Sequence, residues 1–156
     1  MSQNQIANAA LENLFQTAVE GVNSTKLNLL PPGPYRAQIS KVTPPENLGD
    51  KGSVGFRVYF DILNKPDEEA VFAPLNATIF LDLTPQCYLD MGEGKNVGLG
   101  RLREAVGQNT PDPWTFQNLV GALCQVLVEH VPSKKEAGVV NAQVKKIVSN
   151  DTELAG

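Results

Sequence analysis

The chain has 156 residues, 42% of them apolar, and a formal net charge of −4, which suits one globular domain with its own core. No apolar stretch approaches the roughly 18 residues of a membrane span, and the N-terminus shows no basic segment followed by an apolar run, as a signal peptide would. We therefore expect a protein of the cytoplasm without membrane contact.

The first predicted element is an amphipathic helix over residues 4–22. Its apolar positions follow helical spacing and form one stripe, made by Ala7, Leu11, Leu14, Phe15, Ala18 and Val22. We expect this stripe to pack on the domain, with self-association as the alternative. The proline-rich stretch 30–34 predicts a rigid, extended separator between the helix and the strands that follow.

The first predicted strand covers residues 35–43, with Tyr35, Ala37 and Ile39 on one face, and it ends at two prolines. A polar loop over residues 46–53 follows and carries Lys51. The second strand, 54–63, alternates most regularly. Its apolar face is formed by Val54, Phe56, Val58, Phe60 and Ile62, and its other face by Gly55, Arg57, Tyr59 and Asp61.

The third strand region covers residues 71–83 and is interrupted at Pro74. Alternation in its later half turns Phe80 away from the apolar face. A short helix is predicted over 96–106 and a second one over 115–120. Strands over 123–130 and 139–148 complete the domain, and the polar loop between them, 132–138, carries Lys134 and Lys135.

This order of elements predicts a mostly β protein. The simplest fold with this order of elements is a five-stranded Greek-key barrel of the OB type, with the helical insertion between strands three and four and an additional N-terminal helix. A small β-sandwich with a helical cap is the structural alternative. We divide the chain into a helix and linker (1–28), the β domain (29–148) and a short flexible tail (149–156).

The sequence offers no pattern typical of an enzyme, a metal site or a cofactor site. Cys87 and Cys124 lie in apolar stretches without metal-ligand spacing. His130 is interpreted as a packing residue. The stretch 92–96 lacks the first glycine and the Ser/Thr of a phosphate-binding loop, and the acidic run 67–69 fits a solvated turn. We therefore expect no catalytic residues and no cofactor.

Two stretches of the chain carry a family resemblance. The first runs from Leu30-Pro31-Pro32-Gly33-Pro34-Tyr35 through the Gly49 and Gly52 loop to the strand Phe56–Ile62. The second begins with Gly98-Leu99-Gly100-Arg101-Leu102-Arg103 and continues through the last two strands. Together they resemble a family of small phage proteins, long described only as a domain of unknown function, over residues 28–148. Its members are thought to be OB-like single-stranded DNA-binding proteins of replication and recombination systems.

The resemblance implies single-stranded DNA as the ligand, phage or host replication and recombination proteins as partners, and possible homo-oligomers. Binding without sequence preference needs positive charge and exposed aromatic faces. Arg57, Tyr59 and Phe80 are the candidates on the second and third strands. The loops that would clamp the ligand carry Lys51 and the pair Lys134 and Lys135.

The charge distribution leaves room for this function. Residues 61–93 hold seven acids and one base, whereas residues 94–148 hold seven bases and four acids, so a local positive groove is compatible with the negative total. The alternative function is structural. A small β protein with a proline-rich arm and an N-terminal helix also suits a virion or decoration protein that assembles on itself or on a capsid, and it would then be located in the virion.

Overall fold

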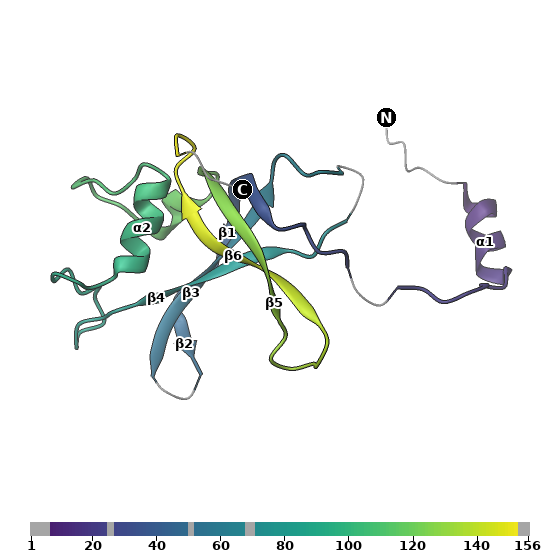
Figure 1. Ribbon diagram of the computed structural model, residues 1–156, viewed down its shortest axis with the longest axis horizontal. Coiled ribbons are helices and arrows are strands. Elements are labelled where there is room, and N and C mark those ends of the chain that lie inside the picture. The colour runs from purple at the N-terminus through teal and green to yellow at the C-terminus, as the bar shows by residue number, and fades with distance from the viewer. Residues whose placement is uncertain (1–6, 25–26, 50–51, 68–70, 153–156) are drawn as a thin grey trace.

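The computed structural model describes residues 7–24, 27–49, 52–67 and 71–152. The described elements are α1 (Asn8–Gln16), β1 (Gly33–Val42), β2 (Glu46–Leu48), β3 (Ser53–Ile62), β4 (Leu75–Leu81), α2 (Val97–Ala105), the 3-10 turn η1 (Phe116–Leu119), β5 (Leu123–Pro132) and β6 (Val140–Val148). The predicted mostly β class is confirmed (Figure 1). No helix in the described ranges is long and apolar enough to cross a membrane.

The described strands form one open antiparallel sheet of six strands. One edge of β3 pairs with β1 and β2, which lie one after the other along it, and the other edge pairs with β4. β1 also pairs with β5, and β5 pairs with β6. β4 and β6 lie at the two ends of this order and contact each other, but they form no ladder. The sheet therefore curls back on itself and remains open between β4 and β6.

β2 was not expected, because its polar residues lie within the predicted loop 46–53. Glu46, Asn47 and Leu48 pair with Gly55, Val54 and Ser53. Gly49 and Gly52 flank the turn and both have positive φ, 71° and 76°, a conformation that glycine adopts without strain. Backbone pairing across this hairpin, which side-chain polarity does not reveal, makes the segment a strand.

The core lies between the curled sheet and α2. The predicted alternation of β3 is confirmed, because Phe56, Val58 and Phe60 are buried and Arg57 is exposed. α2 adds Leu99 and Leu102, which are almost completely buried. The Phe56 ring meets the ring of Phe116 from η1 edge-on, at 5.0 Å between centroids. Burial of these apolar side chains is the main force that holds the helical insertion against the sheet.

Two bulges change the alternation that a regular strand would have. In β1 the register with β3 shifts between Ile39 and Lys41, and in β6 the register with β5 skips Lys145. Strict alternation after Ile39 would turn Lys41 toward the core, but Lys41 is exposed and Val42 packs against the core instead. Each bulge thus leaves two neighbouring residues exposed, Ser40 with Lys41 and Lys145 with Lys146.

The N-terminal helix differs most from expectation. α1 spans nine residues, and Thr17, the residue after it, already has extended backbone angles. The predicted packing of its apolar stripe on the domain is not seen, because every residue from 7 to 24 is exposed. In Figure 1, α1 stands apart from the sheet, at the opposite end of the molecule from α2. Periodicity reveals an apolar stripe, but it does not reveal whether the chain offers a surface to cover it.

The start of the predicted tail is attached to the domain. The side-chain amide of Gln125 donates to the carbonyl oxygens of Ser149 and Thr152, and the hydroxyls of Ser149 and Thr152 are 2.9 Å apart. Residues 149–152 therefore form a turn against β5. The remainder of the tail lies outside the described residues.

Candidate nucleic-acid interface

The outer face of β3 and β4 brings together three of the residues predicted to bind DNA. Tyr59 lies opposite Asn76, Arg57 opposite Thr78, and Gly55 opposite Phe80. Residues that are paired across two strands share a face of the sheet. Tyr59 and Phe80 are four residues apart along the strands, which is about 13 Å at the strand rise of 3.3 Å per residue, and Arg57 lies between them.

Tyr59 has a cation beside its ring. The ammonium of Lys41, from β1, lies 5.6 Å from the ring centroid. Tyr59 also lines a hollow of about 240 Å³ together with Ser40, Asp61 and Lys65. The ring is half-buried, so part of it is accessible for stacking and the surrounding charge includes two lysines and one aspartate.

Arg57 is held by its backbone while its guanidinium remains accessible. Its N–H donates to Thr43 Oγ1 at 2.8 Å, and its carbonyl accepts from the Thr43 N–H at 3.0 Å. Arg57 Nη1 lies 3.8 Å from Glu46 Oε1, and both side chains are about half exposed. An exposed pair of this kind is weak, at about 0–1 kcal/mol, so a phosphate can compete with Glu46 for the guanidinium.

Phe80 is the most exposed aromatic residue of this face, at 61%. Its register partner is Gly55, which is buried because Leu48 from β2 lies over it. A Cβ at Gly55 would be 2.8 Å from Leu48 Cδ1 and 2.6 Å from the Ile79 carbonyl oxygen. The glycine therefore allows β2 and β4 to approach β3 closely, and Leu48 adds an apolar side chain beside the Phe80 position.

Two of the predicted loop lysines lie on the turn between β5 and β6 and not on β3 or β4. Lys134 and Lys135 are exposed on the turn between β5 and β6, where Ser133 Oγ accepts from the N–H groups of Lys135 and Glu136 at 3.2 Å each. In the view of Figure 1, this turn and the β2–β3 hairpin both point toward the bottom of the picture. Lys51 lies outside the described residues. Among the described contacts, none joins Lys134 or Lys135 to Arg57, Tyr59 or Phe80.

Lys41 and Lys65 belong to this surface but were not predicted as site residues. The bulge in β1 turns Lys41 onto the outer face, and a bulge leaves no reliable mark in the alternation of one strand. Lys65 follows β3 and lines the hollow beside Tyr59. The only sequence signal for either residue was its closeness along the chain to a strand that carries other candidates.

The glycine-rich stretch 92–96 serves as a structural connection. Asn96 adopts a left-handed conformation, with φ 52°. Its amide nitrogen Nδ2 donates to the carbonyl oxygens of Asp82 and Asp90, and its Oδ1 accepts from the Asp82 N–H. The Asn96 N–H in turn donates to Asp82 Oδ2 at 2.9 Å. This network joins the end of β4 to the start of α2.

The single histidine also has a structural contact. His130 Nε2 donates to the Leu30 carbonyl oxygen at 2.9 Å, which joins β5 to the chain just before β1. Within the described ranges, no group of three or more His, Cys, Asp or Glu side chains is arranged to hold a metal ion. In comparisons with known proteins, no family model matches the chain and no curated protein is similar to it.

Proposed function

We propose that this protein binds single-stranded DNA across the outer face of β3 and β4, without strong sequence preference. The observation that carries the proposal is the exposed row of Tyr59, Arg57 and Phe80, with Lys41 beside the tyrosine ring. Two aromatic side chains about 13 Å apart would each stack a different base, and the cations between and beside them would contact the phosphates.

The strand pairing supports an OB-type reading of the fold. β1 pairs with β3 and β5, β3 with β4, and β5 with β6, which is the order expected of a Greek-key barrel that is partly open. α2 follows β4, where such barrels carry a helical insertion. In that arrangement nucleic acids lie on the second and third strands, which correspond here to β3 and β4.

The positions of the two described helices also support the proposal. α2 packs its buried residues Leu99, Leu102 and Ala105 toward the core, and α1 stands apart from the sheet (Figure 1). Neither described helix covers Arg57 or Phe80, which remain exposed. The resemblance to phage single-stranded DNA-binding proteins adds the expected setting, which is DNA replication or recombination in the host cytoplasm together with partner proteins of those systems.

The test is fluorescence anisotropy of a labelled oligo-dT titrated with protein at low and at high salt. We expect binding that weakens as salt increases, because each phosphate that a cation neutralises releases counterions. Phe80→Ala and Arg57→Ala should each weaken binding. Thr78→Ala, which changes the exposed residue paired with Arg57 without removing a ring or a charge, is the matched control. If micromolar protein in low salt does not change the anisotropy, the proposal is wrong.

A structural, assembly-forming protein is the second candidate, and one observation favours it. α1 and the segment after it expose Leu14, Phe15, Val19 and Val22 by 66% or more of their surface, and such apolar surface is typical of contacts with other molecules. An assembly that forms without nucleic acid, in a protein that does not bind oligo-dT, would favour this function over DNA binding.

A further inference from the structure

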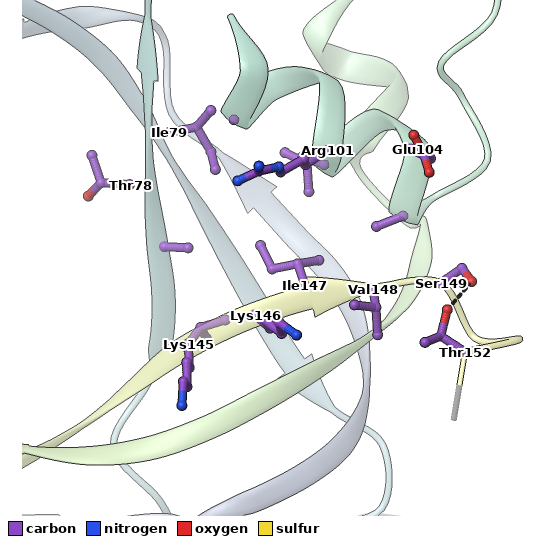
Figure 2. A pocket seen from close by; sticks show the side chains of 15 residues that line it. Thr78, Ile79, Arg101, Glu104, Lys145, Lys146, Ile147, Val148, Ser149 and Thr152 are labelled. Atoms are coloured by element: carbon purple, nitrogen blue, oxygen red, sulfur yellow. Dashed lines mark hydrogen bonds between the residues drawn. The ribbon is translucent and has the colours of Figure 1, made fainter. Parts of the chain in front are cut away.

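A hollow of the described surface lies where the sheet fails to close. It is a cleft of about 670 Å³ between α2, β4 and β6. Among the described strands, β4 is paired only with β3 and β6 only with β5, so each strand presents an unpaired edge here. Figure 2 shows Ile147 of β6 pointing up toward α2 and Ile79 of β4 beside the start of the helix.

The cleft combines an apolar floor with a positive rim. Ala77, Ile79, Leu102, Val144 and Ile147 supply apolar surface, and the charged lining residues are three bases and one acid. Arg101 extends from α2 across the cleft toward β4 (Figure 2). Among the described residues Lys145 has a partner, Glu129 at 4.0 Å, whereas no ion pair is formed by Arg101 or Lys146.

The N-terminal arm, residues 7–24, has the complementary composition. It carries Glu12 and Glu20 and neither lysine nor arginine. Each of its residues is exposed, and Phe15 is exposed by 91%. On a helix with 3.6 residues per turn, Leu11, Leu14 and Phe15 share one face, and Glu12 lies at the border of that face beside Phe15.

We propose that α1 of one copy of this protein docks in the α2–β4–β6 cleft of a second copy. Leu11, Leu14 and Phe15 would cover the apolar floor, and Glu12 would meet Arg101 at the rim. The match is one of charge as well as polarity, because an arm with acids and no bases would meet a cleft with three bases and one acid. Two copies that exchange arms would form a closed pair with two identical contacts.

The geometry favours docking of α1 in the cleft of a second copy over docking in the cleft of its own chain. α1 and α2 lie at opposite ends of the molecule, with the sheet between them (Figure 1). Beyond the arm, the chain meets the domain at Asn28, which bridges to Phe72. The thirteen residues 17–29 span about 40 Å when extended, which is enough to carry α1 onto a neighbour. The inference concerns self-association and does not depend on DNA binding.

The first test is sedimentation velocity from low to high micromolar protein, without nucleic acid. We expect association that increases with concentration and that is lost in the double variant Leu14→Ser, Phe15→Ser. These two side chains are exposed, so the variant keeps the folded domain, which a melting curve checks. A wild-type protein that remains monomeric over the whole range would overturn the proposal.

A charge exchange identifies the surface that the arm occupies. Arg101→Glu and Glu12→Arg should each weaken association about 5- to 10-fold, and the double variant Glu12→Arg, Arg101→Glu should recover it. Lys95→Glu, an exposed site just before α2 and outside the cleft, is the matched control and should have no effect. If arms pair with each other instead, Arg101→Glu will leave association unchanged, and the proposal is wrong.

A disulfide distinguishes exchange between copies from docking within one copy. In a Cys87→Ser background, Glu12→Cys and Arg101→Cys are combined, and the dilute protein is oxidised and analysed on a non-reducing gel. We expect covalent dimers. A disulfide confined to monomers would place α1 in the cleft of its own chain and would overturn the assignment to a second copy.

Discussion

The ammonium of Lys41 lies 5.6 Å from the centroid of the Tyr59 ring. This relationship exists because a bulge in β1 turns Lys41 outward and the register with β3 places it opposite Tyr59. A solvent-accessible cation at this distance from an aromatic ring is attracted by about 0.5–1 kcal/mol. The lysine thus remains close to the ring, where a bound base would bring its phosphate.

Tyr59→Ala should weaken oligo-dT binding about 5-fold or more, because a base stacked on an aromatic ring contributes about 1–3 kcal/mol. The melting temperature should change little, since the ring is only half-buried. Anisotropy and thermal denaturation measure the two effects. Tyr88→Ala is the matched control, because Tyr88 is 73% exposed on a turn beyond β4. Unfolding of the Tyr59 variant would show instead that the ring belongs to the core.

Lys41→Ala should reduce the salt dependence of binding. A contact to one phosphate of a single strand contributes about 0.7 to the slope of log K against log salt, so the slope should become shallower by roughly that amount. The same measurement on Lys95→Ala, which removes an equal charge before α2, should leave the slope unchanged. Equal slopes for wild type and the Lys41 variant would place Lys41 outside the interface.

Gly55→Ala should destabilise the protein by about 1–3 kcal/mol. The added methyl would be 2.6 Å from the Ile79 carbonyl oxygen and 2.8 Å from Leu48 Cδ1, so β4 or the β2 hairpin must shift. Urea denaturation measures the change. Gly100→Ala in α2 is the control: its added methyl would meet nothing within 4 Å, and alanine should stabilise the helix by about 0.4–1 kcal/mol. Similar effects at both positions would contradict the close approach at Gly55.

The two cysteines should differ in reactivity. Cys124 is completely buried, and burial raises the pKa of its thiol to about 11, whereas Cys87 is exposed. A thiol reagent should modify one cysteine in the native protein and both in denaturant. Rapid modification of both native thiols would show that the core opens easily.

The same pKa shift predicts a loss of stability in alkali. The folded-state pKa of Cys124 is raised from 9.0 to about 11, so the unfolded chain loses its thiol proton at lower pH than the folded chain does. The contribution of Cys124 to stability is complete below pH 9 and is lost as the pH rises from about 9 to about 11. Cys124→Ala should make the free energy of unfolding less dependent on pH in this interval. If the free energy of unfolding depends on pH equally in the variant and the wild type, the raised pKa of Cys124 is contradicted.

Much of the architecture follows from local patterns in the sequence. Strict alternation determined which residues of β3 face the core, because a strand that is buried on one side must separate apolar from polar side chains at every step. The same alternation correctly turned Arg57, Tyr59 and Phe80 outward. The helical insertion was visible because Leu99 and Leu102 have the spacing of one helix face.

Only the tertiary structure decided the neighbours of these residues. The bulge that moves Lys41 beside Tyr59, the pairing that makes Glu46–Leu48 a strand, and the open seam between β4 and β6 all depend on backbone registers between distant segments. A local pattern records which side chains avoid water, but it does not record which strand edge finds a partner. For the same reason the apolar stripe of α1 was evident from the sequence, whereas its exposure was evident only from the fold.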